Sequence, residues 1–487
     1  MNYTDINTLG DLKKSGYTSI SIKEELRKNL IHKLKNQETV FEGVWGYENS
    51  VIPELETAIL SKHNINLLGL RGQAKTRLAR LMVNLLDEYI PVVEGSEIND
   101  DPLQPLSRYA KELIKEKGDN TPISWLHRSE RFYEKLATPD VTVADLIGDV
   151  DPIKAMNLKL NYADDRVIHF GMIPRANRCI FVINEIPDLQ ARIQVSLFNI
   201  LQEGDIQIRG FKLRLPLDIQ FVFTANPEDY TNRGSIVTPL KDRIGSQILT
   251  HYPKSIDIAE KITAQEANNL ESQKETVYVP KLAKRLVEQI SFEARDSEYV
   301  DVKSGVSARM SISVLENLIS TAERRSFLTE DASTTVRLLD FFGAIPAITG
   351  KIELVYEGEQ EGADFVAQNL INNAVKTLFL ELFPEIKKLK KEDEKTPYDE
   401  IAQWFYSSDA VELLDDMDDT YFRAQLDVIK PLDTLVVKYQ PNCAKEDVYF
   451  LKEFILWALS EFKILNKKRF TKGFQFNDSL ANYIRGI

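Results

Sequence analysis

Residues 69–76 read Gly69-Leu70-Arg71-Gly72-Gln73-Ala74-Lys75-Thr76. They follow the short apolar run Ile65–Leu68, which is typical of a strand. The residues behind them repeat at the spacing of one helical face: Leu78, Leu81, Met82 and Leu85. A strand, a glycine-rich turn and a helix in this order predict a phosphate-binding loop. The backbone N–H groups of such a turn and the N-terminus of the helix attract anions.

Three side chains of this loop matter for a bound nucleotide. Lys75 would reach the terminal phosphates, and the Thr76 hydroxyl would bind Mg²⁺. Ala74 stands where the last glycine of the pattern usually lies, and we expect its methyl group to be tolerated with a negative φ. The alternative interpretation is an ordinary turn that contains Lys-Thr by chance.

The composition indicates a globular protein. The chain has 487 residues, 43% of them hydrophobic and 28% charged, which is enough for several domains with sizeable cores. Its net charge of −13 argues against a general nucleic-acid binder, because such proteins need a basic surface. Cys179 and Cys443 are too few for a disulfide framework, so we expect a reducing, cytoplasmic location.

Neither membrane insertion nor a structural zinc site is predicted. No run approaches the roughly eighteen apolar residues of a membrane helix, and the N-terminal residues lack the pattern of a signal peptide. The five histidines are scattered and form no HExxH motif or Cys/His cluster.

Two further apolar runs predict buried strands. Residues 179–183 are apolar throughout, as in a strand of a parallel sheet, and Asn184 and Glu185 follow at the carboxyl end. Ile219–Ala225 predicts a similar strand that ends at Asn226. Residues 206–215 alternate around Arg209-Gly210 and predict a hairpin between the two runs. Alternating strands and helices predict an α/β fold with a mostly parallel sheet.

The order of these features resembles that of AAA+ ATPases: phosphate loop, strand ending in a carboxylate, hairpin, strand ending in Asn, then Asp242-Arg243. More narrowly it is similar to the branch of the magnesium chelatase ATPase subunit and the MoxR-type ATPases. That branch has an insert in the second helix, matched here by residues 145–178, and a hairpin before the sensor-1 strand. The resemblance covers residues 44–253 well and 254–325 loosely, and the Gln-Ala-Lys-Thr form of the loop is similar to MoxR-type loops.

The resemblance implies a nucleotide site for ATP and Mg²⁺. Gly46 and Tyr47 match the segment that packs on the adenine base. The phosphates and Mg²⁺ would be held by the loop residues Gly69, Gly72, Gln73, Ala74, Lys75 and Thr76. Position 184 usually holds an aspartate that supports Mg²⁺, and Asn184 carries no net charge, so we expect the ion to be held more weakly.

The resemblance also implies four catalytic roles. Glu185 matches the acidic residue that orients the attacking water, and Asn226 matches sensor 1, which positions that water. Arg243 matches the arginine finger that enters the neighbouring subunit's site, and Arg309 matches the sensor-2 arginine of a helical lid. A finger that acts in trans implies a head-to-tail ring, and we expect a hexamer.

Four segments are expected. Residues 1–43 form an N-terminal helical segment, with one helical face from Ile22 to Leu34, and 44–252 form the P-loop AAA+ core with a surface insertion at about 95–135. Residues 253–330 form the helical lid, and 331–487 form a mainly helical C-terminal region. Within that region, residues 351–356 are expected to form a short strand and 387–395 a charged, solvated run.

Four functions remain open from the sequence. The first is an ATP-driven motor of MoxR or chelatase type that remodels or activates a partner, such as a separate protein with a von Willebrand factor A-type domain. The second is the chelatase motor itself, which serves porphyrin metallation, although the insertion and the long C-terminal region disfavour it. The third is a nucleotide-binding scaffold with little hydrolysis, which Asn184 keeps open. A DNA motor fits the acidic composition least.

Overall fold

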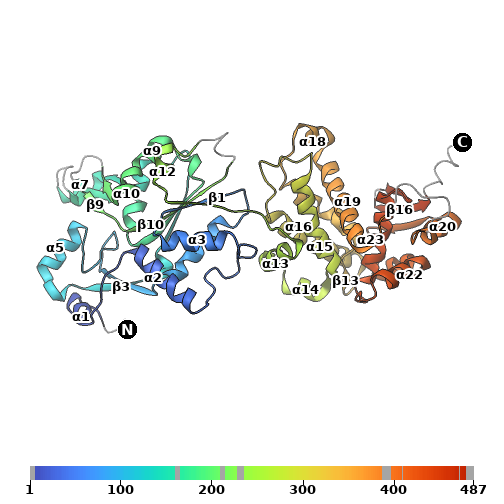
Figure 1. Cartoon of the computed structure of the whole chain (residues 1–487), viewed down its shortest axis with the longest axis horizontal. Coiled ribbons are helices and arrows are strands. Elements are labelled where there is room, and N and C mark those ends of the chain that lie inside the picture. Colours follow the sequence, from blue (N-terminus) through green and yellow to red (C-terminus); the bar gives the residue numbers. More distant parts are fainter. Residues whose placement is uncertain are drawn as a thin grey trace. The chain divides into compact units, whose positions relative to one another are not determined.

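The computed structural model describes residues 6–159, 165–208, 214–227, 235–386, 396–408, 410–470 and 472–478. The chain forms two compact units, Met1–His251 and Tyr252–Ile487. Figure 1 shows the first unit from blue to green and the second from yellow to red. The predicted division into four segments stays a prediction, and each unit is described by itself.

A five-stranded parallel sheet forms the centre of the first unit. Its order is β11 (Ser246–Leu249), β1 (Ile65–Leu68), β10 (Ile219–Ala225), β7 (Cys179–Asn184) and β4 (Phe132–Leu136). Every residue of β7 and β10 is buried, as the two apolar runs predict. The α/β class with a parallel P-loop core is therefore confirmed.

Helices cover both faces of this sheet. Ile180, Val182 and Val222 pack toward α2 (Ile22–Lys35), α3 (Val51–Leu60) and α4 (Lys75–Leu81). Phe181 and Phe223 belong to a second core, together with residues of α9 (Ala191–Ser196), α10 (Phe198–Glu203) and α12 (Thr238–Arg243). Figure 1 shows these three helices near one another beside the sheet. Residues of a strand alternate between faces, so each strand supplies both cores.

The remaining elements of the first unit are short. Its other helices are α1 (Leu9–Lys14), α5 (Arg108–Lys117), α6 (Val143–Leu146), α7 (Pro152–Leu158) and α8 (Met172–Arg175), with 3₁₀ turns η2 (Met82–Leu85), η3 (Gly118–Asn120), η4 (Arg128–Glu130), η5 (Asp165–Val167) and η6 (Ile186–Asp188). Leu34, expected on the buried face of α2, is 40% exposed because it lies in the last turn. The helix expected after the phosphate loop ends at Leu81 and continues as η2.

The expected surface insertion at 95–135 is more integrated than predicted. It contains β3 (Ile123–His127), which pairs antiparallel with β2 (Tyr89–Val93) in a sheet of its own. It also contains most of β4, the edge strand of the central sheet. The sequence did not indicate this strand, because β4 mixes polar and apolar residues instead of forming an apolar run.

Two further antiparallel pairs lie within the first unit. One joins β5 (Gly148–Val150) to β6 (Ile168–Phe170), inside the insert expected at 145–178. The other joins β8 (Asp205–Gln207) to β9 (Arg214–Pro216) and confirms the predicted hairpin. The turn at Arg209-Gly210 lies outside the described residues.

The second unit is chiefly helical around one apolar core. Its helices are α13 (Ile256–Glu266), α14 (Glu271–Thr276), α15 (Lys281–Asp296), α16 (Arg309–Thr329), η7 (Leu338–Ala344), α17 (Ile345–Thr349), α18 (Tyr356–Glu361), α19 (Ala363–Leu382), α20 (Asp399–Ser407), α21 (Asp419–Asp427), α22 (Lys430–Tyr439) and α23 (Val448–Glu461). A short parallel pair joins β12 (Val277–Tyr278) to β13 (Thr334–Thr335).

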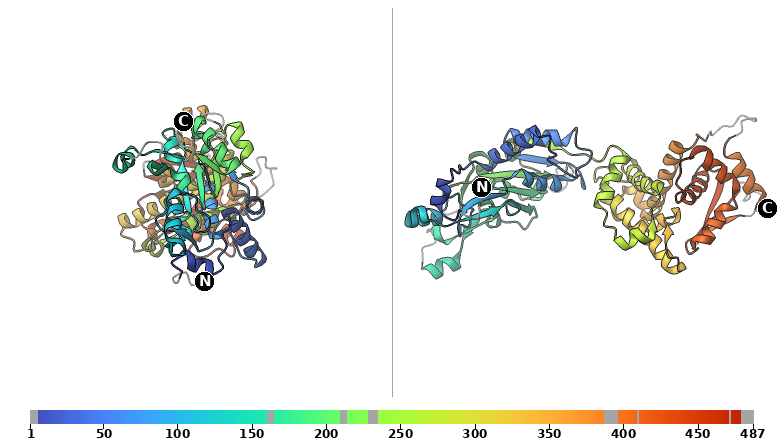
Figure 2. Two further views of the ribbon diagram at one scale, coloured as in Figure 1. Left: turned by 90° about the vertical axis from the view of Figure 1, so that its left-hand side faces the viewer. Right: turned by 90° about the horizontal axis from the view of Figure 1, so that it is seen from below.

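The C-terminal region departs from the sequence expectation in two places. A three-stranded antiparallel sheet of β14 (Val411–Leu414), β16 (Gly473–Asp478) and β15 (Leu465–Phe470) lies beside the last helices (Figure 2). The strand expected at 351–356 is wrong: only Leu354 makes a single bridge, to Val300, and Tyr356 begins α18. The charged run 387–395 lies outside the described residues.

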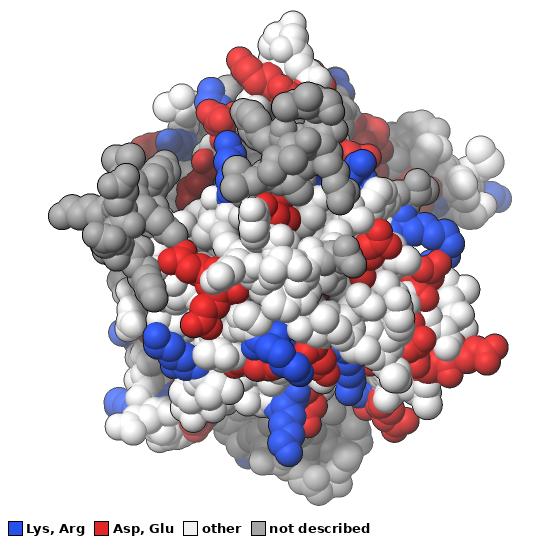
Figure 3. All heavy atoms as spheres, turned by 90° about the vertical axis from the view of Figure 1, so that its right-hand side faces the viewer, with Lys and Arg blue, Asp and Glu red and all other residues white. Residues whose placement is uncertain are grey.

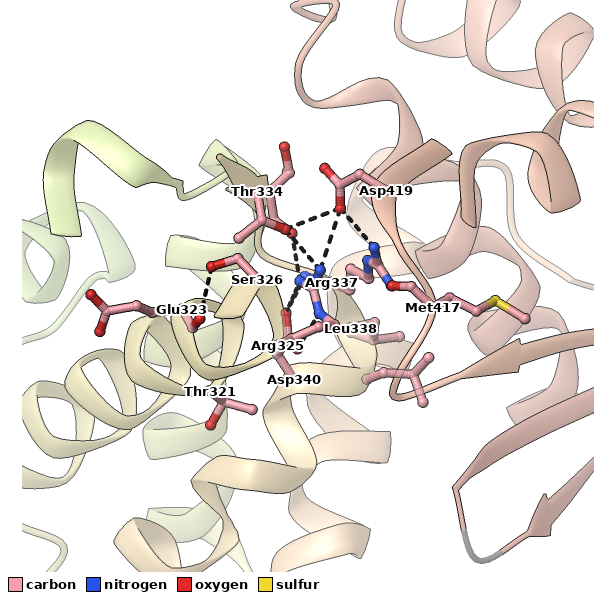
Figure 4. A network of polar contacts seen from close by, with 12 residues as sticks. Thr321, Glu323, Arg325, Ser326, Thr334, Arg337, Leu338, Asp340, Met417 and Asp419 are labelled. Atoms are coloured by element: carbon pink, nitrogen blue, oxygen red, sulfur yellow. Dashed lines mark hydrogen bonds and ion pairs between the residues drawn. The ribbon is translucent and has the colours of Figure 1, made fainter. Parts of the chain in front are cut away.

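A buried ion-pair network ties α16 to η7 and α21 (Figure 4). Arg325 bonds both carboxylate oxygens of Asp340, and its Nη2 lies 2.9 Å from Oδ2. Arg337 Nη2 lies 2.6 Å from Asp419 Oδ1 and packs on the Phe422 ring. These cations are each 4% exposed or less, so the geometry of all three elements is fixed together.

The surface shows no single-sign field on the face drawn in Figure 3. Basic and acidic side chains surround an uncharged centre among the residues coloured there. Separately, none of the described helices has the length and apolar content needed to cross a membrane.

Candidate nucleotide site

One edge of the central sheet gathers most of the predicted site residues. The five strands are parallel, so their carboxyl ends meet at the same edge. Gly69 follows β1, Glu185 follows β7 and Asn226 follows β10. The register pairs Leu68 with Ala225, which places the phosphate loop beside Asn226.

The phosphate loop is tightly packed at its first glycine. A Cβ on Gly69 would lie 1.9 Å from Thr250 Oγ1 and 2.2 Å from Gln73 Oε1. Those two side chains already bond each other, with Thr250 Oγ1 2.7 Å from Gln73 Oε1. Gly69 therefore lets the loop close against Thr250, the residue that follows β11, and Gln73 is only 6% exposed.

Ala74 adopts a conformation that contradicts the sequence expectation. Its φ of 54° and ψ of 18° lie in the left-handed region, as does the φ of 72° at Gly72. A side chain there costs about 1–2 kcal/mol in general, which explains why glycine is usual. The loop keeps its shape with alanine and stores this strain where the helix α4 begins.

Lys75 closes the loop from inside. Its ammonium donates to the carbonyl oxygens of Gly69 and Leu70, the latter at 3.0 Å, and the residue is 7% exposed. Thr76 is the second residue of α4 and half-buried. Both side chains stand at the N-terminus of a helix, the position that favours phosphate.

Tyr47, which is expected to pack on the adenine base, makes several contacts within the protein. It is 5% exposed, and its hydroxyl lies 3.0 Å from the carbonyl oxygen of Gln73 and 2.8 Å from that of His251. Its ring meets the His251 ring edge-on at 4.9 Å between centroids. Gly46, with a φ of 84°, turns the chain just before it. These contacts show Tyr47 holding the loop to the end of the first unit.

Asn184 and Glu185 belong to a network across three strands. Thr224 Oγ1 on β10 donates to Asn184 Oδ1 at 3.1 Å and accepts the Glu185 N–H at 3.1 Å. Asn184 Nδ2 donates to Glu134 Oε1 on β4 at 2.6 Å. Glu185 has a left-handed φ of 53°, which turns it out of the strand at the sheet edge.

The two predicted arginines lie in different units. Arg243 ends α12, where its guanidinium bonds Gln202 Oε1 at 2.8 and 3.0 Å and the Pro239 carbonyl oxygen at 2.7 Å. Arg309 is the exposed first residue of α16 in the second unit. A cation at a helix N-terminus is electrostatically unfavourable on its own, and a bound anion would offset this.

The residues present fit a nucleotide phosphate chain with Mg²⁺. The loop offers backbone N–H groups, a helix N-terminus and Lys75, and Thr76 offers an oxygen. Asn184 Oδ1 accepts one bond and keeps a second lone pair. Among the described residues, no group of three His, Cys, Asp or Glu side chains is arranged to hold a metal ion.

The sequence reasoning missed Glu134, Arg80 and Thr224. Glu134 and Thr224 lie inside strands, where polar residues carry no motif. Arg80 is four residues after Thr76, the spacing of one helical face, and this was the one available indication.

Comparison with known proteins supports the core of this assignment. Residues 161–245, which hold Asn184, Glu185, Asn226 and Arg243, match the family described as the Sigma-54 interaction domain. The match spans less than half of the chain. With the observed strand order, it supports an AAA+ ATPase-type core, and the narrower likeness to the MoxR branch stays a prediction.

Solved structures overlap the chain only in part. The complex of subunits BchI and BchD of magnesium chelatase is 18% identical, covering 66% of this chain and 98% of that chain with a TM-score of 0.35. NtrX from Brucella abortus in complex with ATP is 13% identical; the match covers 60% of this chain and 52% of that chain, with a TM-score of 0.32. Hsp104 with ATPγS and casein is 13% identical; the match covers 72% of this chain and 55% of that chain, with a TM-score of 0.39. No curated protein matched the chain.

Proposed function

We propose that the first unit binds ATP with Mg²⁺ at the carboxyl edge of its sheet and hydrolyses it. The chain would act as a motor of MoxR or magnesium-chelatase type that remodels or activates a partner protein. One observation supports this most: the phosphate loop, the Asn184-Glu185 pair and Asn226 end neighbouring parallel strands at a single edge.

Each residue has a role that its position allows. Lys75 and the loop N–H groups bind the terminal phosphates, and Thr76 with Asn184 supports Mg²⁺. Glu185 orients the attacking water, and Asn226 holds it toward the terminal phosphate. Phosphoryl transfer needs alignment and charge more than covalent chemistry, which suits a site built from fixed strand ends.

The assembly is proposed from Arg243 and Arg309. Arg243, on the surface of the first unit, would enter the site of the next subunit in a head-to-tail ring, which we propose to be a hexamer. It would first have to leave Gln202. Arg309 would reach the nucleotide from the lid. A separate protein with a von Willebrand factor A-type domain is the proposed partner class.

The function is tested with two substitutions that separate binding from hydrolysis. Lys75→Ala should abolish binding of a fluorescent ATP analogue, because Lys75 both meets the phosphates and closes the loop. Glu185→Gln should keep binding and lower steady-state turnover by about a hundredfold or more, the loss typical of a missing general base. Lys115→Ala, on the exposed side of α5, is the matched control. Unchanged affinity in Lys75→Ala would contradict the site.

A scaffold that binds ATP and scarcely hydrolyses it is the second candidate. Asn184 favours it, because a neutral amide holds Mg²⁺ less firmly than a carboxylate. Binding without turnover in the wild-type chain, at any Mg²⁺ concentration, would decide for the scaffold. A pull-down with Glu185→Gln would then identify the partner in either case, because a trapped ATP state retains it.

A further inference from the structure

The amide of Asn184 has a charged neighbour that the sequence does not reveal. Its Nδ2 donates to Glu134 Oε1 at 2.6 Å, a short, charge-assisted bond. Asn184 is 9% exposed and the Glu134 side chain 23%, so water competes little for the bond. The neighbouring strand β4 therefore places a carboxylate, that of Glu134, beside position 184, where an aspartate is usual and this chain has an asparagine.

Strand geometry fixes this pairing. Leu136 of β4 is in register with Asn184 of β7, and Glu134 is in register with Val182. Phe132 and Val182 pack on the same side of the sheet, against the core that includes α4. Glu134 and Asn184 share that side, because alternate residues of a strand face the same way. The carboxylate and the amide thus both face the helix of the phosphate loop.

Helix α4 completes the arrangement. Arg80 Nε and Nη2 donate to Glu134 Oε2 at 3.1 and 2.7 Å. Thr76, the proposed Mg²⁺ ligand, lies one turn earlier on the same face of α4. The chain of contacts runs from Arg80 through Glu134 and Asn184 to Thr224, and ends at the Glu185 N–H.

We propose that Glu134 is a positioning residue of the nucleotide site. Its carboxylate fixes the Asn184 amide, with Oδ1 toward Thr224, and supplies from the neighbouring strand the negative charge that residue 184 lacks. The proposal rests on the proposed function of this site. An amide at position 184 suits the Glu134 carboxylate, because Asn184→Asp would place two carboxylates at hydrogen-bond distance, where they would repel each other.

The test counts carboxylates at the pair. The pair of residues 134 and 184 has one carboxylate in the wild type, none in Glu134→Gln and two in Asn184→Asp. The double variant, which combines Glu134→Gln with Asn184→Asp, has one carboxylate again, but the donor and the acceptor have changed places. The first readout is the free Mg²⁺ concentration that gives half of the Mg²⁺-dependent gain in affinity for a fluorescent ATP analogue. The second is the unfolding temperature of the first unit without Mg²⁺ or nucleotide.

The expected results differ for each variant. In Glu134→Gln, the free Mg²⁺ concentration at half of the affinity gain should rise by about tenfold or more, because one interaction with a charged group is lost. Asn184→Asp should lower the Mg²⁺-free unfolding temperature, and the double variant should restore both readouts toward wild type. Glu112→Gln, which breaks an exposed pair with Arg108, is the matched control for charge and should change neither.

Arg80→Met separates positioning from a merely structural role. If Glu134 acted only by anchoring α4, Arg80→Met would raise the Mg²⁺ requirement as much as Glu134→Gln, and that result would overturn the proposal. Additive effects in the double variant would also overturn it, while nucleotide binding itself would stand. A wild-type chain that binds no analogue with or without Mg²⁺ would overturn the proposed function together with this inference.

Discussion

Ala74 holds a backbone conformation that a side chain disfavours. Its φ of 54° lies within a loop whose other turn residue, Gly72, also has a positive φ. The methyl group packs at the margin of the core beneath α4, which offsets part of the cost. β-branched side chains are strongly disfavoured in this backbone conformation.

We therefore predict opposite tolerance for two substitutions. Ala74→Gly should change the free energy of unfolding of the first unit by less than about 1 kcal/mol, because relief of strain and gain of unfolded-state entropy oppose each other. Ala74→Val should destabilise it by about 2 kcal/mol or more and weaken nucleotide binding. Denaturant unfolding measures both.

Ala110→Gly provides the control for these substitutions. Ala110 is fully buried inside α5, where helical glycine costs about 1 kcal/mol relative to alanine. An Ala74→Gly variant destabilised as much as Ala110→Gly would show that residue 74 carries no strain.

At the scale of elements, apolar runs made the interior predictable. The strands β7 and β10 could be predicted from the sequence because both of their faces are buried, and α2 could be predicted from the spacing of its apolar residues. β4 did not, because an edge strand mixes polar and apolar residues. The C-terminal sheet was not predicted for the same reason, because β15 carries Lys467, Lys468 and Arg469 in succession.

The sequence predicts only those parts of the site that form short motifs along the chain. The phosphate loop, Asn184-Glu185 and Asn226 stand in recognisable order along the chain. The backbone strain at Ala74 and the partners Glu134 and Thr224 arise from strand register, which no local pattern encodes. Tyr47 was recognised by position, but its burial against Gln73 was not foreseen.

A buried carboxyl on α23 gives the second unit a pH-dependent stability. Glu453 is fully buried, and burial raises its pKa from 4.5 to about 7, although the N–H groups of Leu338 and Leu339 favour the charged form. Because the folded-state pKa is the higher one, the stabilisation is complete below about pH 4.5 and is lost as pH rises through 7.

We predict that unfolding of the second unit becomes easier between pH 5 and 7, by up to about 1 kcal/mol per pH unit from this one proton. With Trp45 and Trp125 replaced by Phe, the fluorescence of the two tryptophans of the second unit, Trp404 on α20 and Trp457 on α23, reports the unfolding. Glu453→Gln should flatten that part of the profile. Equal slopes in both proteins would assign the pH dependence to other groups.

At the scale of the whole molecule, two separate cores predict two unfolding transitions. The apolar clusters of the first unit contain no residue beyond Ile248, and that of the second begins at Val277. A ligand bound to the first unit should raise its transition alone, by about 2.7 kcal/mol when present at a hundred times its dissociation constant. Scanning calorimetry with and without Mg-ATPγS measures this.

Lys75→Ala is the control for that experiment, since it should remove the nucleotide-dependent rise while both transitions remain. A single cooperative transition for the wild type would contradict the independence of the two cores. A rise of both transitions that also disappears in Arg309→Ala would assign part of the binding energy to the second unit.

Tyr47 has one hydroxyl proton and two carbonyl acceptors. Gln73 belongs to the phosphate loop, and His251 is the last residue of the first unit, so the two carbonyls compete for a single donor. Whichever carbonyl holds the proton, the other is bonded less well, by about 1 kcal/mol. This phenol therefore links the phosphate loop to the last residue of the first unit, so that a shift of either carbonyl changes how the single proton is shared.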